Sequence, residues 1–182
     1  MQTYVIHWPE DLAKLQELHS GDMVRLNGVL YTARDAAHRR MVDLLDRGES
    51  LPFDLRNSAI YYAGPCPCPP GRTVGSIGPT TASRMDAYKE RLMQAGMKLM
   101  IGKGVCSPAL SSLCQRYGAV YLAAPGGVAA LSSACVVQAE LIAWEDLGAE
   151  AVRKLIVQDM DLVVINDVHG RDYYREVLAE QL

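Results

Sequence analysis

A threonine and an arginine, Thr80 and Arg84, stand four residues apart where the sequence predicts that a helix begins. Side chains at positions i and i+4 project from one face of a helix, so the hydroxyl and the guanidinium should lie together on its first turn. One predicted strand further along, Lys103 stands between Gly102 and Gly104, where that strand gives way to the next helix. Backbone N–H groups and fixed positive charge at such junctions hold small anions. The two segments together predict an anion-binding site.

A third cationic group, Arg34, comes just before another predicted helix. A guanidinium in that position can point at a ligand instead of lying along the helix surface. Within the helix, Arg39 and Arg40 are predicted to be surface residues. His38 and His169 are predicted to be scaffold residues, because a lone histidine is usually a hydrogen-bonded structural group. Arg34 is therefore the residue of this segment that we expect at the anion site.

Each of these residues also has a purely structural interpretation. Thr80 or Thr81 would make a good N-cap, with Pro79 near the helix start, and Arg84 could be a solvated helix residue. The conjunction with Lys103 favours a ligand site, because the strand-to-helix junctions of neighbouring parallel strands lie side by side. The segment around Lys103 lacks the third glycine of a dinucleotide fingerprint and the Ser or Thr that follows Gly-Lys in a P-loop, so both of these phosphate-loop patterns are weak.

The bulk composition predicts one globular domain over residues 1–182. Its 18 Lys and Arg against 21 Asp and Glu give a net charge of −3, so a basic nucleic-acid-binding surface is not expected. The first residues resemble no signal peptide, and no apolar run approaches the ~20 residues of a membrane span, so no membrane partner is expected. Five cysteines, an odd number without disulfide-like spacing, favour a reducing, cytoplasmic location.

Cys66 and Cys68 flank a proline, and two thiols one residue apart can share a metal ion. The usual spacings in metal clusters are Cys-x₂-Cys or longer. The other thiols, Cys106, Cys114 and Cys135, offer no matching pair. We therefore expect a proline-stiffened loop with incidental thiols, and no metal ligands on this chain.

The pattern of apolar residues predicts the elements that position these side chains. A short helix is expected over residues 11–19, and residues 23–32 alternate around Asn-Gly, the strongest short signal for a β-hairpin. Further strands are expected over residues 59–63, 73–77, 98–101, 119–124 and 161–166, and helices over 34–45, 85–95 and 108–117. Strands that alternate with helices indicate parallel βαβ units, to which the hairpin adds an antiparallel element. The sequence therefore predicts a mixed α/β domain.

Four segments, taken in order, resemble the β subunit of class I iron–sulfur fumarate hydratase and L(+)-tartrate dehydratase. They are residues 32–40 (Thr-Ala-Arg-Asp-Ala-Ala-His-Arg-Arg), 60–65 (Ile-Tyr-Tyr-Ala-Gly-Pro), 78–86 (Gly-Pro-Thr-Thr-Ala-Ser-Arg-Met-Asp) and 101–104 (Ile-Gly-Lys-Gly). The resemblance runs from about Gly21 to the end and includes Asn-Asp-Val-His-Gly at 166–170. In single-chain members this region is the C-terminal domain, so the sequence resembles one half of a two-chain enzyme.

The resemblance implies a swivelling β/β/α domain and an oxygen-sensitive [4Fe–4S] cluster whose ligands lie on the α subunit. It implies that Arg34, Arg84 and Lys103 bind the carboxylates of a small dicarboxylate substrate. It also implies that Thr80 lies beside the carbon-bound proton as a candidate base, with Lys103 as its catalytic neighbour. A threonine hydroxyl is a poor base unless nearby positive charge stabilises its alkoxide. The alternative role for Thr80 is substrate hydrogen bonding together with helix capping.

The function expected from this resemblance is the reversible hydration of fumarate to L-malate, carried out with the α subunit. The alternative is the β subunit of L(+)-tartrate dehydratase, towards which the Arg-Asp-x-x-His-Arg-Arg run and the late His-Gly lean slightly. A third hypothesis is a non-catalytic anion-binding module, which the joint presence of Arg34, Thr80, Arg84 and Lys103 disfavours. A homodimer of β chains or of αβ units is compatible with the resemblance.

Overall fold

The computed structural model describes residues 1–125, 127 and 129–179, which form a mixed α/β structure. The described strands are β1 (Thr3–Trp8), β2 (Met23–Thr32), β3 (Ala59–Tyr61), β4 (Leu99–Gly102), β5 (Val120–Ala123), β6 (Val136–Ala143) and β7 (Val152–Asn166). The described α-helices are α1 (Asp35–Asp46), α2 (Asp86–Gln94), α3 (Leu110–Tyr117), α4 (Ala129–Ala134) and α5 (Tyr173–Ala179). Short 3₁₀ helices are η1 (Leu12–Glu17), η2 (Ala82–Met85) and η3 (Glu145–Glu150). The predicted mixed α/β class is confirmed, while the swivelling β/β/α description stays a prediction.

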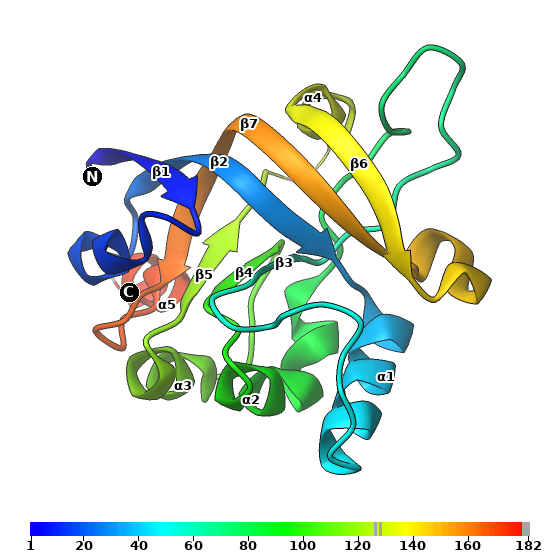
Figure 1. Ribbon diagram of the computed structural model, residues 1–182. Helices are drawn as coiled ribbons and strands as arrows, with labels where there is room; N and C mark the ends of the chain where they lie inside the picture. The colour runs from blue at the N-terminus through cyan, green and yellow to red at the C-terminus, as the bar shows by residue number, and fades with distance from the viewer. Residues whose placement is uncertain (126, 128, 180–182) are drawn as a thin grey trace.

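The strand pairings of the sheet close into a ring (Figure 1). β2, β3, β4 and β5 are each parallel to the next, and β7 is antiparallel to both β5 and β2. β1 extends β2 and β6 extends β7 as outer strands. Parallel strands end at the same edge of a sheet, so the residues that follow β2, β3 and β4 must meet at one edge.

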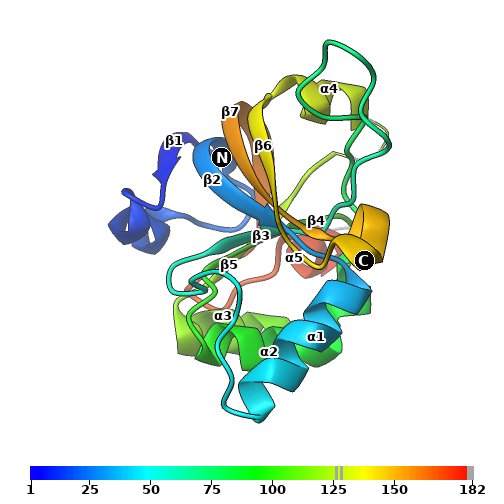
Figure 2. The same ribbon diagram turned by 45° about the vertical axis from the view of Figure 1, so that its right-hand side comes forward.

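Two hydrophobic cores lie on the two faces of the short parallel strands. Tyr61 and Ile101 point into the core enclosed by the ring, whereas Ile60 and Met100 point outward into a second core. This alternation follows from the two-residue period of a strand. Helices α1, α2 and α3 cover the outer core on one side of the sheet (Figures 1 and 2). Because both faces of these strands are buried, β3, β4 and β5 are apolar or nearly so throughout.

The hairpin predicted around Asn27-Gly28 is wrong, because residues 23–32 form the single continuous strand β2. Gly28 has a φ of +112° at a register shift between β2 and β7. A Cβ at this position would overlap the backbone carbonyl oxygen of Trp8 in β1. The glycine therefore allows a β-bulge and a close approach between neighbouring strands, which is the other use of glycine inside a strand.

Three further differences concern irregular or extended segments. Residues 73–77 are not a strand but a loop. The Cys66 N–H donates a hydrogen bond to the Ser76 carbonyl oxygen in this loop at 2.9 Å. The last expected strand begins nine residues earlier than predicted, at Val152 instead of Asp161, and its partner β6 was not expected. The expected helix over residues 11–19 is the shorter 3₁₀ helix η1. Tertiary pairing and loop hydrogen bonds determine the secondary structure of all three segments, and these contacts leave no trace in the local pattern of apolar residues.

The helices over residues 34–45, 85–95 and 108–117 and the strands over 59–63, 98–101 and 119–124 are confirmed within a few residues. None of the helices in the described part of the chain has the length and hydropathy needed to cross a bilayer.

Replacing Gly28 by alanine is expected to lower the free energy of unfolding by about 3 kcal/mol, because the new Cβ strains the backbone and collides with Trp8. The matched control is Gly48→Ala: Gly48 also has a positive φ, +70°, but has nothing within 4 Å of the added Cβ. That variant should lose only about 1 kcal/mol. Urea denaturation of both variants checks this, and equal losses would contradict the close approach.

Candidate functional site

The ends of the parallel strands bring the predicted cationic residues to one edge of the sheet. Arg34 is the second residue after the end of β2, and Lys103 comes directly after β4. The strand between them, β3, is followed by Tyr62, whose carbonyl oxygen accepts a hydrogen bond from the Thr80 N–H at 2.6 Å. The Lys103 N–H in turn donates to the Thr80 carbonyl oxygen at 3.1 Å. Thr80 is thus inserted as extended backbone between the ends of two strands.

The prediction that Thr80 and Arg84 share the first turn of a helix is wrong. The helical backbone begins at Ala82, and Thr80 lies before it in extended conformation. Thr81 occupies the N-cap position of η2, but its side chain makes no capping hydrogen bond. The reason is tertiary, since the N–H and C=O groups of Thr80 are both used by neighbouring strand ends. The same pairing places Thr80 beside Lys103, which the sequence did predict.

Arg84 is held by a carboxylate at the start of α1. Its Nε lies 3.0 Å from Asp35 Oδ1, and its second terminal nitrogen lies 2.8 Å from Asp35 Oδ2. This two-point contact is the usual geometry between a guanidinium and a carboxylate. Because Asp35 is the residue next to Arg34, the ion pair also links Arg84 to the segment that carries Arg34. The Arg84 side chain is 48% exposed, so its ion pair with Asp35 is open to competition from a dissolved anion.

Arg34 has a carboxylate partner of its own, Glu150, at 3.4 Å. Glu150 also accepts a hydrogen bond from the Ala36 N–H at 2.9 Å, at the start of α1. Arg34 Nε is buried, and among the described residues it has no hydrogen-bond partner. Its side chain passes Gly64, where an added Cβ would lie 3.2 Å from Arg34 Cδ and would overlap the Ala149 carbonyl oxygen. The glycine after β3 therefore leaves room for this arginine.

Lys103 differs from the two arginines, since no carboxylate of the described chain forms an ion pair with its exposed side chain. The cluster thus contains two cations neutralised by Asp35 and Glu150 and one that faces solvent. Neither carboxylate was identified from the sequence as part of the site. The only sequence signal for Asp35 is its position in the first turn of a helix, where an acidic side chain is ordinarily favourable.

A family comparison bears directly on these residues. The model described as Fumarase C-terminus matches residues 4–177 and so includes every residue of the cluster. The chain belongs to this fumarase C-terminal family. A Methanocaldococcus jannaschii protein named provisionally as L(+)-tartrate dehydratase subunit beta is 41% identical over 169 residues, covering 90% of this chain and 87% of that protein.

Two Escherichia coli proteins are also similar to this chain, but the chain covers very different shares of their lengths. The L(+)-tartrate dehydratase subunit beta is 34% identical over 177 residues, which cover 94% of this chain and 87% of the relative. The aerobic class I fumarate hydratase is 36% identical over 174 residues, which cover 94% of this chain but 32% of the enzyme. The chain therefore spans about a third of the length of the fumarate hydratase and most of the length of the tartrate dehydratase subunit.

The class I enzymes of this family imply an iron–sulfur cluster, and the thiols of this chain do not fit it. Cys66 and Cys68 are exposed in the proline-rich loop, and Cys68 Sγ contacts the Arg72 carbonyl oxygen at 3.0 Å. Burial raises the pKa of the Cys106 and Cys114 thiols, which opposes the thiolate form that iron requires. In the described residues, no three His, Cys, Asp or Glu side chains are grouped as a metal ion needs.

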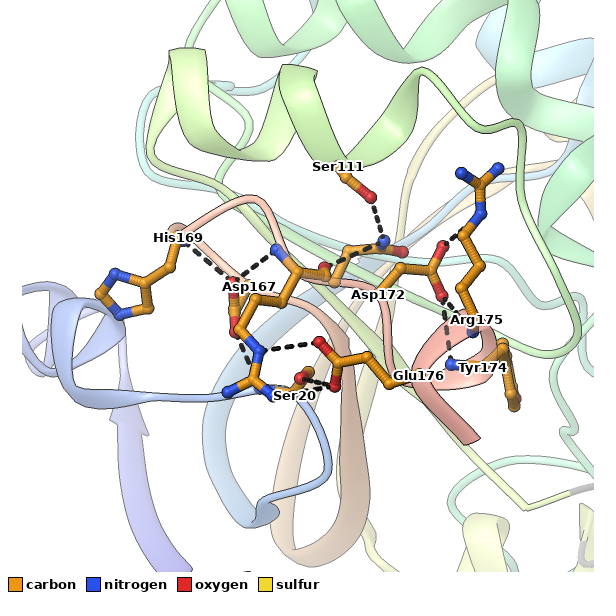
Figure 3. A network of polar contacts seen from close by, with 10 residues as sticks. Ser20, Ser111, Asp167, His169, Asp172, Tyr174, Arg175 and Glu176 are labelled. Atoms are coloured by element: carbon orange, nitrogen blue, oxygen red, sulfur yellow. Dashed lines mark hydrogen bonds and ion pairs between the residues drawn. The ribbon is translucent and has the colours of Figure 1, made fainter. Parts of the chain in front are cut away.

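The segment Asn166–Gly170, which contributed to the family resemblance, lies at the opposite edge of the sheet. Asp167 is fully buried and accepts hydrogen bonds from the N–H groups of Ser20, His169 and Arg171 at 2.8, 2.9 and 3.1 Å (Figure 3). Ser20 comes before β2 begins, whereas Arg34 follows its end. The His-Gly segment of this fumarase-family chain thus braces the starts of the strands.

Both histidines singled out in the sequence make structural contacts. His169 Nε2 contacts the Gln16 carbonyl oxygen at 3.1 Å, and its ring stacks on that of His19 at 4.6 Å. His38 Nδ1 lies 2.9 Å from the Arg34 carbonyl oxygen, which can only accept, so Nδ1 carries the proton. Burial lowers the pKa of His38 from 6.5 to about 4, which keeps its imidazole neutral beneath the cationic cluster.

Acid should therefore destabilise the chain through His38. The unfolded residue takes up a proton below its usual pKa of 6.5, while the folded residue resists until about pH 4, so stability is lost as the pH falls through this window. The linkage predicts a loss of about 2 kcal/mol in unfolding free energy between about pH 7 and pH 5 from this residue. Urea denaturation at both pH values should show that His38→Gln removes this share of the pH dependence. Identical pH dependence in the two proteins would overturn the assignment.

Proposed function

We propose that the chain is the β subunit of a class I hydro-lyase that hydrates fumarate reversibly to L-malate, at a site shared with an α subunit. The observation that carries this proposal is the meeting of Arg34, Arg84, Lys103 and Thr80 at one sheet edge. Family membership supports it, because relatives bear the names of fumarate hydratases and tartrate dehydratase subunits. Three cations and a threonine at one sheet edge suit a small substrate that carries two carboxylates.

The charge arrangement suits a dicarboxylate better than a single anion. Arg34 and Arg84 are each neutralised by a carboxylate of the chain, at 3.4 and 2.8 Å, whereas Lys103 is exposed. A substrate carboxylate would bind beside Lys103 first and then compete with Asp35 or Glu150 for an arginine. We propose that Arg34, Arg84 and Lys103 divide the two carboxylates between them in this way.

Thr80 is proposed as the residue beside the carbon-bound proton. In the dehydration direction a base removes the proton from the carbon next to a carboxylate, and the electron pair left on carbon delocalises into that carboxylate. Fixed cations lower the energy of the negative charge that develops there. Arg84 and Lys103 would also favour an alkoxide on Thr80, which a lone hydroxyl could not sustain near neutral pH. The alternative role of Thr80 is to donate its hydroxyl to the substrate.

The α subunit is proposed as the holder of the [4Fe–4S] cluster and as the second wall of the site. Two observations support this assignment. The cationic cluster is open to solvent at Arg84 and Lys103, so it needs a cover to exclude water. The chain also covers 87% of a relative that is named as one subunit, beta, of L(+)-tartrate dehydratase. We place the complex in the cytoplasm, where the five free thiols of the chain would stay reduced.

Tartrate is the second candidate substrate, and one observation favours it. The relatives of comparable length, from Methanocaldococcus jannaschii and Escherichia coli, carry the name of L(+)-tartrate dehydratase subunit beta. One additional substrate hydroxyl could be recognised by a few loop side chains, which leaves the cationic cluster common to both functions.

Turnover should require both subunits. The chain alone is expected to be inactive on fumarate, L-malate and L(+)-tartrate, and activity should appear when the cognate α subunit with an intact cluster is added without oxygen. The absorbance of fumarate and the formation of oxaloacetate from tartrate measure the two reactions, and their kcat/KM values decide the substrate. Robust turnover by the isolated chain would refute the shared site, and an inactive complex would favour a non-catalytic anion-binding module.

Removing one cation of the cluster should abolish turnover without preventing assembly. Lys103→Ala or Arg84→Ala is expected to lower kcat/KM by about 10³-fold, because the charge that develops on the substrate loses its partner. Arg39→Ala is the control, since Arg39 is an exposed arginine of α1 outside the cluster. Size-exclusion chromatography reports assembly, and equal activity in all three complexes would contradict the assigned roles.

A further inference from the structure

Lys89 is a buried lysine whose charge neither the fold nor the proposed reaction explains. Its side chain is 1% exposed and lies in the layer between α2 and the outer face of the sheet. Burying an ammonium group is costly, and an apolar side chain of similar size usually stabilises a protein at least as well. A role beyond stability is therefore worth seeking in its contacts.

The Lys89 ammonium is surrounded by partners from four separate segments. It lies 2.6 Å from Asp86 Oδ1 at the start of α2 and 3.0 Å from Cys106 Sγ. It also lies 5.8 Å from the ring centre of Tyr62 and 5.6 Å from that of Tyr121, distances at which an aromatic face attracts a cation. One charge thus binds α2, β5 and the segments that follow β3 and β4.

The residues around Lys89 anchor the segment 103–107, here named the Lys103 loop, along its length. Cys106 is bound directly through its sulfur. The second oxygen of Asp86 accepts a hydrogen bond from the Ser107 N–H at 2.9 Å. The hydroxyl of Tyr121, whose ring faces Lys89, donates to the Gly104 carbonyl oxygen at 2.9 Å. Three successive anchors therefore restrict the backbone next to Lys103.

The same ammonium also acts on the other side of the cluster. Tyr62, whose ring faces Lys89, receives the Thr80 N–H on its carbonyl oxygen at 2.6 Å. Movement of Tyr62 would shift the backbone of Thr80. Movement of the Lys103 loop would shift Lys103 itself. Lys89 is thus linked by short chains of contacts to both residues of the proposed reacting pair.

We propose that Lys89 is a positioning residue that keeps Thr80 and Lys103 in a fixed position relative to each other, through contacts in the core next to the sheet edge. Asp86 and Tyr121 serve as its relays to the Lys103 loop, and Tyr62 serves as its relay to Thr80. The buried charge contributes to the exact placement of Thr80 and Lys103 rather than to the stability of the fold. The inference rests on the proposed function, since it presumes that Lys103 contacts a carboxylate of the substrate.

The kinetic test uses Lys89→Met in the complex with the α subunit. Small misplacements of a binding group cost about 10²-fold in rate, and kcat/KM should fall by that order. The Ki of succinate, an unreactive dicarboxylate, should rise at least about tenfold, because the Lys103 ammonium no longer meets the carboxylate. A merely structural defect lowers the active fraction and hence kcat, and it leaves KM and the succinate Ki unchanged.

Lys98→Met is the matched control. Lys98 is partly buried just before β4 begins, at the far end of the same strand, where its ammonium donates to the Tyr117 carbonyl oxygen. Both variants remove one lysine charge and one set of hydrogen bonds, but only Lys89 reaches the Lys103 loop. Wild-type KM and Ki in Lys89→Met, or equal changes in the two variants, would overturn the proposal.

A second measurement does not depend on catalysis. Hydrogen exchange of the Ser107 amide in the isolated chain should be at least about tenfold faster in Lys89→Met than in wild type or Lys98→Met. If Lys89→Met does not fold, Tyr121→Phe loosens the Gly104 anchor alone and should show a smaller change in KM. Faster exchange in an inactive complex would refute the proposed function and retain the anchor, whereas unchanged exchange in an active complex would refute the anchor only.

Discussion

The antiparallel pairing between β2 and β7 determines where the cationic cluster can form. It joins the end of β2 to the beginning of β7, where Tyr31 pairs with Lys154 and the Thr32 hydroxyl is placed between the backbone groups of Ala151 and Arg153. Through this junction Glu150 reaches Arg34, the second residue after β2. β7 then pairs with β5, which fixes β4 and the lysine that follows it. The parallel strands alone put their ends at one edge, and this pairing closes the ring and brings Glu150 to that edge beside Arg34.

Two layers of polar contacts surround that edge, and they differ in exposure. The outer layer consists of the arginine–carboxylate pairs of Arg84 with Asp35 and Arg34 with Glu150, which are partly exposed and held at 2.8 and 3.4 Å. The inner layer is centred on Lys89, Tyr62 and Tyr121, which are buried, although the Asp86 partner of Lys89 is 24% exposed. Screening by solvent makes the outer pairs weak and exchangeable, while the inner contacts act in a low dielectric and resist change. The arginine–carboxylate pairs at the surface can therefore exchange partners, whereas the contacts of Lys89 in the core stay in place.

Much of this arrangement could be predicted from the sequence, because several of its signals are local. α1, α2 and α3 follow from apolar periodicity, and α3 ends at Gly118 with φ +58°, as the glycine indicates. Lys103 was predicted to lie beside Thr80 and Arg84 because strand ends meet in parallel sheets, and Arg34 was added because it precedes a helix. The structure places Arg34 and Lys103 at one edge. Their roles in binding a substrate stay predictions.

The failures of prediction share one physical cause, which is that long-range pairing overrode a local signal. Asn27-Gly28 is a strong turn signal, yet Trp8 and β7 occupy both sides of it and keep the strand extended. Thr80 looked like a helix cap, but Tyr62 and Lys103 use its backbone groups first. Glu150 and Lys89 gave no sequence signal, because their importance depends on partners far along the chain.

If Arg34 and Arg84 bind the substrate as proposed, the carboxylates that neutralise them would also select against small inorganic ions. A solute such as chloride offers one diffuse charge and cannot match the two-oxygen contact that Asp35 already gives Arg84. Under the proposed function, only an anion with carboxylate-like geometry would replace Asp35 without losing the two-point contact, and only a dicarboxylate would gain Lys103 as well. Asp35 and Glu150 would then favour release of a bound dianion, since each arginine has a carboxylate of the chain to return to when the ligand leaves. Rapid exchange of ligand would be the consequence of a site that keeps its own counterions.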